Sequence, residues 1–438
     1  MAVYDWNKFG LHIPQIMIPK EGTDYYKWAC VACDQYTSEP EYWKKVEETV
    51  GDAPSTFRLM LPEIFLGKDG EEERSQAIKR TMAEYLEDGT LRVLEPGAML
   101  VKRTAEGRTR LGLVIATDLE AYDFNKGSTS LTRATEGTVV ERIPPRLRIR
   151  KDAPIEMPHI IILIDDPEKT VIEPLVDMPR IPIYDTELMM NGGHVSGEFI
   201  KEADLAGMQQ ALSALYDKAE AKYGAGNVIF QAMGDGNHSL ATAKTAWEEI
   251  KKTLSPEEIE THPARYALCE IENIHDDGIV FEPIHRVIFA KQNNQSGKDL
   301  VDALVSHLKD QNGNAYLAAR DAAVPEGAFE IPYIILGERG KIVIENPSNK
   351  LEVGALQNAL DIMVKQEKIC DIDYIHGTAA VNKLAEQQGN AGFMLPPMDK
   401  SLLFPAVAAD GALPRKTFSM GEANEKRYYI EARRIEKL

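Results

Sequence analysis

A polar turn between an apolar segment and a helical pattern holds the residues best suited to chemistry. The turn reads GDGNHS (234–239), and the segment after it places apolar residues at helical spacing, at Leu240, Trp247, Ile250 and Leu254. The first amides of a helix lack partners inside the helix and lie at the positive end of its dipole, so they suit an anion. The same pattern is also that of a capped helix after a tight turn that binds nothing.

Individual residues of this turn could serve a phosphate in different ways. Gly234 and Gly236 would let a ligand approach the backbone, and residues 237–239 are of types that favour a helix start. His238 could contact a phosphate or transfer a proton near neutral pH. The turn has neither the lysine of a Walker A loop nor the spacing of the dinucleotide fingerprint. The residues by themselves leave a phosphate site and a plain turn both open.

Two cysteines, Cys30 and Cys33, form a C-x-x-C pair, which is typical of a redox motif or of half a zinc site. The other cysteines, Cys269 and Cys370, are single and distant, so they complete no zinc pattern. The surrounding ACVAC segment is apolar, which suits small buried thiols equally well. We therefore favour buried thiols over redox or metal chemistry.

The elements that must position these residues alternate irregularly along the chain. Helical patterns lie at 39–50, 73–87, 197–222, 299–311 and 353–368, and strand-like runs lie at 97–104, 108–119, 159–166, 227–233, 264–273, 278–290 and 426–435. Such an alternation favours a mixed α/β or α+β fold over a regular doubly wound one. The glycine-rich NGGHVSG (191–197) is compatible with a mobile lid or with a simple turn.

Charge and hydropathy exclude several classes of partner. The chain has 438 residues and a formal net charge of -19, which argues against nucleic acid or an anionic membrane as the main partner. No apolar run approaches the length of a bilayer span, and the first residues lack the pattern of a signal peptide. We expect a cytoplasmic protein with neither nucleic acid nor a membrane as partner, and a homo-oligomer is compatible with the same features.

Several segments resemble, in the same order along the chain, family 1015 of the domains of unknown function. GDGNHSLATAKTAW (234–247) resembles that family's Asp-Gly-His-His-Arg helix start. Further similar blocks are ACDQYTSEPEYWKKVEE (32–48), TFRLMLPE (56–63), TRATEGT (132–138), GIVFEPIHRVIF (278–289), CDIDYIHG (370–377) and the region 392–418. The family belongs with the ParB/sulfiredoxin-like fold superfamily, which includes a free-serine kinase.

The resemblance implies a ParB/sulfiredoxin-like core with additional N- and C-terminal α/β elements. The composition turns polar at 291–299, which marks a linker or a domain seam. We therefore predict a ParB/sulfiredoxin-like region with an N-terminal elaboration at 1–292 and a C-terminal α/β region at 293–438.

In that superfamily the corresponding turn binds nucleotide phosphates, so the resemblance implies a nucleotide, ATP or ADP, as ligand. The expected binding residues are Asp235, Gly236, Asn237, His238, Ser239 and Thr138. Asp235 is also the candidate ligand for a possible Mg²⁺, which nucleotide-dependent transferases hold with one or two carboxylates. Asn237 and Ser239 stand where the family has a histidine and an arginine, and the loss of the arginine removes a bidentate phosphate clamp.

Three residues are predicted to take part in catalysis, namely Glu136, Arg133 and His238. Glu136 would be the general base that takes a proton from a hydroxyl substrate. Arg133 would neutralise phosphate charge in the transition state. The alternative is that Glu136 is an exposed loop carboxylate with a nearby ion pair.

The candidates for substrate binding are Asp34, His285, Arg286 and Lys416, all within blocks that resemble the family. Adjacent strand residues point to opposite faces, so at most one of His285 and Arg286 readily faces a shared pocket. The alternatives are an interstrand ion pair for these two residues and a solvated side chain for Lys416.

By analogy with the serine kinase, the sequence predicts a nucleotide-dependent, kinase-like phosphotransferase. It would act on the hydroxyl of a small molecule, with free serine as one candidate. This inference is one of fold-level analogy. The alternative is a non-catalytic regulatory protein of the ParB-like fold that binds a nucleotide or phosphate.

Overall fold

A computed structural model describes residues 5–291 and 295–437, which form two compact units. The first unit comprises Met1–Val280, Leu403–Ala412 and Met420–Leu438, and the second comprises Phe281–Leu402 and Leu413–Ser419. Both units contain a β-sheet covered by helices, so the mixed α/β class predicted from the sequence is confirmed. The domain boundary predicted between residues 292 and 293 lies outside the described residues.

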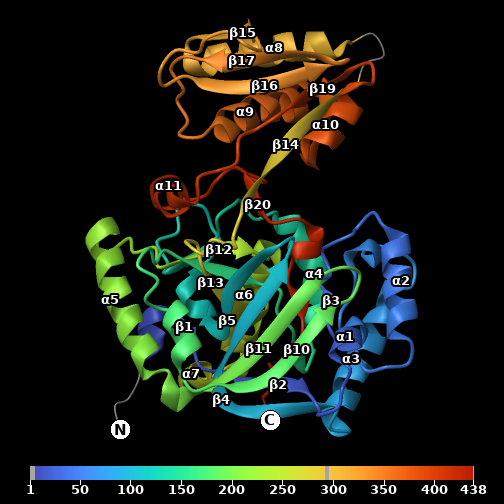
Figure 1. The fold of residues 1–438 in the computed structure, drawn as a ribbon, viewed down its shortest axis with the longest axis vertical. Helices are drawn as coiled ribbons and strands as arrows, with labels where there is room; N and C mark the ends of the chain where they lie inside the picture. Colours follow the sequence, from blue (N-terminus) through green and yellow to red (C-terminus); the bar gives the residue numbers. More distant parts are fainter. Residues whose placement is uncertain (1–4, 292–294, 438) are drawn as a thin grey trace. The chain divides into compact units, whose positions relative to one another are not determined.

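A large mixed sheet forms the centre of the first unit (Figure 1). Its long hairpin pairs β4 with β5 in antiparallel register from Met99↔Val114 to Ala105↔Arg108, as the sequence predicts for this region. Strand β12 (Gln231–Asp235) lies between β9 (Ile161–Ile164), to which it is antiparallel, and β7 (Thr132–Arg133), to which it is parallel. The strand order is β10 (Ile181–Leu188), β11 (Gly193–Lys201), β4 (Leu91–Ala105), β5 (Arg108–Asp118), β13 (Tyr266–Asn273), β9 (Ile161–Ile164), β12 (Gln231–Asp235), β7 (Thr132–Arg133) and β6 (Tyr122–Asp123).

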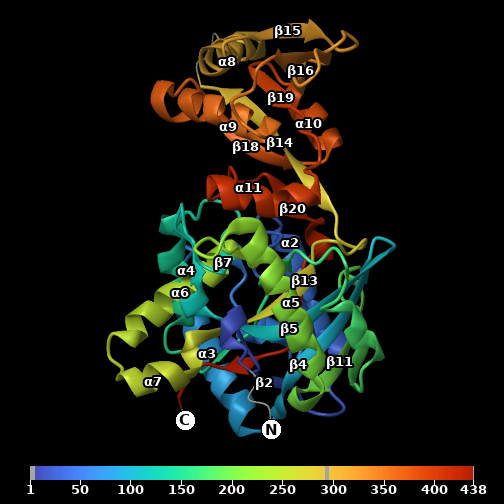
Figure 2. The same ribbon diagram turned by 90° about the vertical axis from the view of Figure 1, so that its left-hand side faces the viewer.

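Both faces of this sheet are buried. Successive residues of a strand point to opposite faces, so neighbours in the sequence enter different cores. Met99 and Val101 belong to one hydrophobic core, whereas Ala98 and Leu100 belong to the other. Helices α2 (Pro40–Val50) and α3 (Glu71–Glu87) supply side chains to the first core, and α5 (Ala206–Tyr223) and α6 (Asn237–Lys251) to the second. Figure 1 shows α5 on one side of the strands and α2 and α3 on the other, and in Figure 2, where the side of α5 faces the viewer, α5 lies in front of β4 and β5. Among the described residues, no helix is long and apolar enough to cross a membrane.

The second unit has its own sheet, in the order β15 (Ala315–Ala319), β17 (Glu338–Ile344), β16 (Phe329–Ile335), β19 (Asn390–Phe393), β14 (Phe281–Ala290) and β18 (Cys370–His376). Helices α8 (Gly297–Asn312) and α9 (Glu352–Asp361) pack on one face, and α10 (Thr378–Ala385) packs on the other. A capping box formed by Ser296 and Asp299 starts α8, which confirms the helix predicted there.

Two predicted elements differ from the structure. The helix predicted at 197–222 is wrong at its start, since residues 197–201 belong to β11 and α5 begins at Ala206. Val195 and Phe199 are buried on one face of β11, so the alternation of period two outweighs the helical pattern that begins later. The glycine-rich segment 191–197 therefore leads into a sheet strand that pairs on both sides and is no lid.

The strand predicted at 426–435 is wrong in extent. It forms two short pairings instead, β21 (Tyr428–Tyr429) with β3 (Cys30–Val31) and β22 (Arg433–Arg434) with β8 (Ile155–Glu156). The residues between these pairings are also buried, so this C-terminal segment runs through the interior and pairs in turn with two different short strands in place of one continuous partner.

Buried ion pairs hold the C-terminal segment in place. The Arg427 guanidinium donates to Glu270 Oε2 at 2.7 Å and to Glu431 Oε2 at 2.8 Å, and it also donates to the carbonyl oxygen of Pro158 at 2.7 Å. All three charged side chains are at most 5% exposed. Because buried charges are stable only when paired, Arg427 makes the fold of the first unit depend on its last residues.

Replacing Arg427 by alanine should therefore destabilise the chain strongly. The substitution leaves two buried carboxylates without their cation, and we expect it to lower the free energy of unfolding by about 3–5 kcal/mol in urea denaturation. Arg434→Ala is the matched control, because Arg434 is 32% exposed and its contact with Glu436 is 4.0 Å long, so its loss should cost less than about 1 kcal/mol. Equal losses for the two variants would contradict this account.

Candidate functional site

The turn GDGNHS (234–239) joins the end of β12 to the start of α6. Gly236 is the N-cap, with φ at 81° in the left-handed region that favours glycine, and it has no side chain to accept from the first amides of the helix. The helix start predicted at 237–239 is confirmed. The first amides of α6 therefore lie at the carboxyl end of a central strand without a side-chain cap from the N-cap residue.

The glycines of this turn serve packing. A Cβ on Gly236 would lie 3.1 Å from Ile160 Cα, and a Cβ on Gly234 would lie 2.5 Å from Met420 Sδ. The space beside each glycine is thus filled by protein atoms. We expected these glycines to leave room for a ligand beside the backbone, but protein atoms fill the space on the side where a Cβ would stand. A ligand would therefore contact the amides of α6 instead.

The loop that follows β7 lies beside this turn. The Thr135 hydroxyl donates to the carbonyl oxygen of Met233 at 2.8 Å, and the Val139 amide donates to His238 Nε2 at 3.3 Å. These contacts follow from the parallel pairing of β7 with β12, which brings the carboxyl ends of both strands to one edge of the sheet. Glu136 is half-buried between the two contacts. The structure thus brings together two segments that the sequence places about a hundred residues apart.

Buried polar atoms without partners gather on these two segments. Within the described residues, Thr138 Oγ1, Asn237 Oδ1 and Arg133 Nη2 have no hydrogen-bond partner. Asn237 is 8% exposed and Arg133 is 1% exposed, and burial lowers the pKa of the arginine. Arg133 Nε is turned to the carbonyl oxygen of Ser130 at 2.8 Å. Burying unpaired polar groups costs free energy, so such atoms mark places where a ligand would compensate them.

Charged residues lie on the other side of the turn. The Lys426 ammonium is 3.0 Å from Asp235 Oδ2, and Asp235 Oδ1 accepts from the Gly236 amide at 2.9 Å. Asp34 Oδ2 is 3.8 Å from His159 Nε2. Burial raises the pKa of Asp34, but His159, a hydrogen bond from Gln35 and the charge of Lys426 together hold it below its ordinary value. Asp34 is therefore ionised at neutral pH beside the start of α6.

A hydrogen-bonded chain connects Ser239 to the interior. Ser239 Oγ lies 2.9 Å from His159 Nε2, and His159 Nδ1 lies 2.7 Å from the Tyr429 hydroxyl. Tyr429 Oη accepts from the Cys33 amide at 3.3 Å, and burial raises the pKa of Tyr429 well above the ordinary value, so the phenol is neutral and able either to donate to Nδ1 or to accept from it. When the ring is protonated both nitrogens donate; when it is neutral, Nε2 donates to Ser239 if Tyr429 donates to Nδ1, and accepts from Ser239 in the other tautomer.

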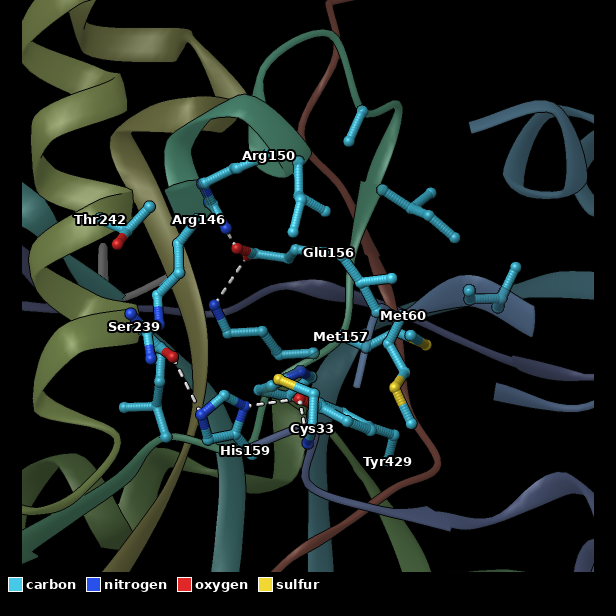
Figure 3. A pocket seen from close by; sticks show the side chains of 18 of the residues that line it. Cys33, Met60, Arg146, Arg150, Glu156, Met157, His159, Ser239, Thr242 and Tyr429 are labelled. Carbon is cyan, nitrogen blue, oxygen red and sulfur yellow. Dashed lines mark hydrogen bonds and ion pairs between the residues drawn. The ribbon is translucent and has the colours of Figure 1, made fainter. Parts of the chain in front are cut away.

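Sequence reasoning missed His159 and Tyr429 because neither stands in a recognisable pattern. They are separated by 270 residues and meet only where the C-terminal segment crosses the first unit. Both line a cavity of about 150 Å³ beside α6, which Figure 3 shows with Ser239 and Thr242 on one side and Met60 and Met157 on another.

The remaining substrate candidates belong to the second unit, and hydrogen bonds of that unit hold them. Arg286 is fully buried in β14 and donates to Gln357 Oε1 and to the carbonyl oxygen of Lys416, both at 3.0 Å. His285 Nδ1 accepts from the Leu395 amide at 3.1 Å. These contacts give the three residues a structural use, and their role toward a substrate stays a prediction.

Metal binding at this site would rest on Asp235. Among the described residues, no group of three or more His, Cys, Asp or Glu is placed to hold a metal ion. A nucleotide-bound Mg²⁺ needs only one or two carboxylates, because phosphates and water complete its shell, so Asp235 fits such an ion in number of ligands. Cys30 and Cys33 are free, and burial raises the pKa of both, which leaves them as unreactive thiols.

Comparison with known proteins gives a family and distant structural likenesses. The family model described as "Protein of unknown function (DUF1015)" matches residues 17–381. No curated protein matches the chain. The ParB/sulfiredoxin-like character of the core stays a prediction.

Three solved structures illustrate the likenesses. A free serine kinase mutant in complex with AMP is 11% identical with a TM-score of 0.39, and the match covers 72% of this chain and 91% of that chain. A conserved hypothetical protein from Pyrococcus furiosus is 12% identical with a TM-score of 0.35, over 72% of this chain and 90% of that chain. SbnI with a C-terminal truncation from Staphylococcus aureus is 8% identical with a TM-score of 0.35, and the match covers 70% of this chain and 82% of that chain.

Two threonines of the same loop provide a test of the site. Thr135→Val removes the donor to Met233, so we expect it to lower the free energy of unfolding by about 1 kcal/mol without changing the response to an anion. Thr138→Val removes a hydroxyl that has no hydrogen-bond partner among the described residues, so stability should hold while the rise in Tm with inorganic pyrophosphate shrinks. Thermal unfolding with and without pyrophosphate measures the stability and the anion response of each variant. If the Tm of Thr138→Val rises with pyrophosphate as much as that of the wild type, this hydroxyl does not contact the anion.

Proposed function

The chain belongs to the DUF1015 family, and we propose that it binds a nucleotide at the start of α6 and transfers the terminal phosphoryl group to the hydroxyl of a small molecule. The observation that carries this proposal is a group of buried polar atoms, on Thr138, Asn237 and Arg133, that have no hydrogen-bond partner in the described part of the chain and lie on two segments joined by the Val139–His238 hydrogen bond. Free serine is one candidate acceptor.

The phosphates would be held mainly by backbone and neutral groups. The first amides of α6 point along the helix axis and carry the positive end of its dipole. Asn237 and Ser239 stand where the family motif has a histidine and an arginine, so cations from other segments have to serve, among them Lys426, 3.0 Å from Asp235, and Arg133 on β7, which pairs with β12. Such an arrangement favours a phosphate chain held by several weak contacts over one held by a single bidentate arginine.

Glu136 is proposed as the general base. The acceptor's hydroxyl oxygen would form a bond to the terminal phosphorus while the bond from that phosphorus to its bridging oxygen breaks. The hydroxyl proton would pass to the Glu136 carboxylate, and the shortened nucleotide would leave with the electron pair. Arg133 and His238 would stabilise the phosphoryl charge, and Mg²⁺, with Asp235 as its protein ligand, supplies further charge neutralisation when bound.

Asp34 is the rival for the base, because it is ionised and lies 3.8 Å from His159, which contacts Ser239 at 2.9 Å. The held-down pKa makes Asp34 a weaker proton acceptor than a carboxylate of ordinary pKa. Asp34 is therefore better suited to orient His159 and the acceptor than to remove its proton.

The test is turnover with a panel of nucleotides and small hydroxyl compounds, serine among them. We expect Glu136→Gln to lower kcat at least about 100-fold, with the Kd for nucleotide unchanged within about twofold, because the amide keeps the shape but not the basicity. Phosphorylated product and nucleotide consumption give kcat, and calorimetric titration gives Kd.

Glu141→Gln is the matched control, since Glu141 lies on the same loop region and is exposed. If Asp34→Asn abolishes turnover and Glu136→Gln does not, the base is Asp34. Nucleotide binding without turnover of any acceptor would favour the alternative of a nucleotide-binding regulatory protein. Absence of binding by any nucleotide would sink both functions.

A further inference from the structure

The cavity beside α6 has a size and position that bear on the acceptor. Its volume is about 150 Å³, and Ser239 and Thr242 reach it from α6 (Figure 3). An apolar cavity of roughly 150 Å³ holds a molecule the size of benzene. Ser239 is the third residue of α6, so the cavity begins within one turn of the amides proposed to hold the phosphates.

Apolar side chains form most of the cavity wall. Met82 and Ile155 are buried, and Ile149 and Met157 are half-buried. Met60 and Leu66 also line the cavity. Methionine side chains adapt their shape to an occupant, so this wall suits a small flexible apolar group.

The charges at the cavity are already neutralised by protein groups. Arg150 Nη2 lies 2.6 Å from Glu156 Oε2, and Glu156 Oε1 also binds Arg433 at 2.7 Å. Arg146 forms an ion pair with Glu63 and donates to the carbonyl oxygen of Arg142 at 2.7 Å. A free amino acid would need a cation for its carboxylate and an anion for its ammonium, and both kinds of group are paired with each other here.

The Ser239 hydroxyl lines the cavity and contacts His159 through one of its hydrogen-bonding sites. With the ring hydrogen on Nε2, Ser239 accepts from His159 and keeps its own hydrogen; in the opposite tautomer it donates to Nε2 and keeps an acceptor lone pair. In either case a hydroxyl of an occupant can form a hydrogen bond with Ser239 while its apolar part lies among the methionines. The polar and apolar sides of the cavity thus match the two ends of a small alcohol.

We propose that the cavity binds the acceptor itself, and that the acceptor is a neutral primary alcohol with an apolar substituent of about four to six carbons. The assignment of this alcohol as acceptor rests on the phosphotransfer function proposed above. Its hydroxyl lies at Ser239, near the start of α6, and its apolar part fills the space between Met60, Met82 and Met157. The product is the corresponding phosphate monoester, formed with the bond changes given above.

Binding of the primary alcohols from 1-propanol to 1-hexanol, followed by NMR titration of the full chain, tests this proposal. We expect each added methylene to tighten binding about fourfold until the cavity is full. L-Serine should bind at least tenfold more weakly than 1-pentanol. Equal affinities along the series, or tighter binding of serine, would overturn the proposal.

Variants of the wall make the test specific. Met157→Ala should weaken 1-pentanol at least fivefold, and Met178→Ala, at a half-buried methionine outside the cavity, should leave its affinity unchanged. Ala153→Leu should weaken it further by filling the space, and Met157→Ala still decides the matter if that variant does not fold. Equal effects of Met157→Ala and Met178→Ala would overturn the assignment of the cavity.

Competition separates the alcohol from the nucleotide. We expect AMP and 1-pentanol to bind to the protein at the same time, with the Kd of each unchanged by the other. If AMP displaces 1-pentanol competitively, the cavity holds the base of the nucleotide and the proposal is wrong. Graded binding of alcohols without phosphoryl transfer to any of them would support the cavity as an alcohol site and would overturn the phosphotransfer function alone.

Discussion

The left-handed turn at Gly236 is the constraint from which the candidate site follows. It ends β12 and starts α6 within one residue, and the space where a side chain would stand is occupied by Ile160. The helix therefore begins at the carboxyl end of a strand flanked by β9 and β7, with its first amides at the edge of the sheet. Everything proposed for the site depends on this position. A helix N-terminus can bind an anion only where no other part of the chain covers its first amides.

Three distant parts of the chain complete the surroundings of that turn. The loop after β7 contributes Thr138 and Glu136, the N-terminal region contributes Asp34, and the C-terminal segment contributes Lys426 and Tyr429. The last two are held by the Arg427 network, in which buried carboxylates on Glu270 and Glu431 share one guanidinium. A buried network of this kind is a weak source of stability but enforces one arrangement, since any other would leave a charge unpaired.

The site combines buried polar atoms that lack a partner with side chains that are hydrogen-bonded to one another. Thr138, Asn237 and Arg133 each bury an atom without a partner among the described residues, whereas Ser239, His159 and Tyr429 form a continuous hydrogen-bonded chain. This division suggests two functions side by side. The atoms without partners suit a polar ligand that supplies them, and the hydrogen-bonded chain suits a cavity whose occupant is mainly apolar and makes one further hydrogen bond to Ser239.

The sequence by itself determined the mixed α/β class, most helices, and a strand followed by a turn and a helix at the GDGNHS segment, where the strand proves to be Gln231–Asp235. Periodicity and turn chemistry act over a few residues, and they therefore locate elements well. Only the tertiary structure decided that the glycines serve packing, that residues 197–201 are a strand, and that His159, Lys426 and Tyr429 lie beside α6. The physical reason is that burial and hydrogen bonding between residues up to 270 positions apart leave no local pattern in the sequence.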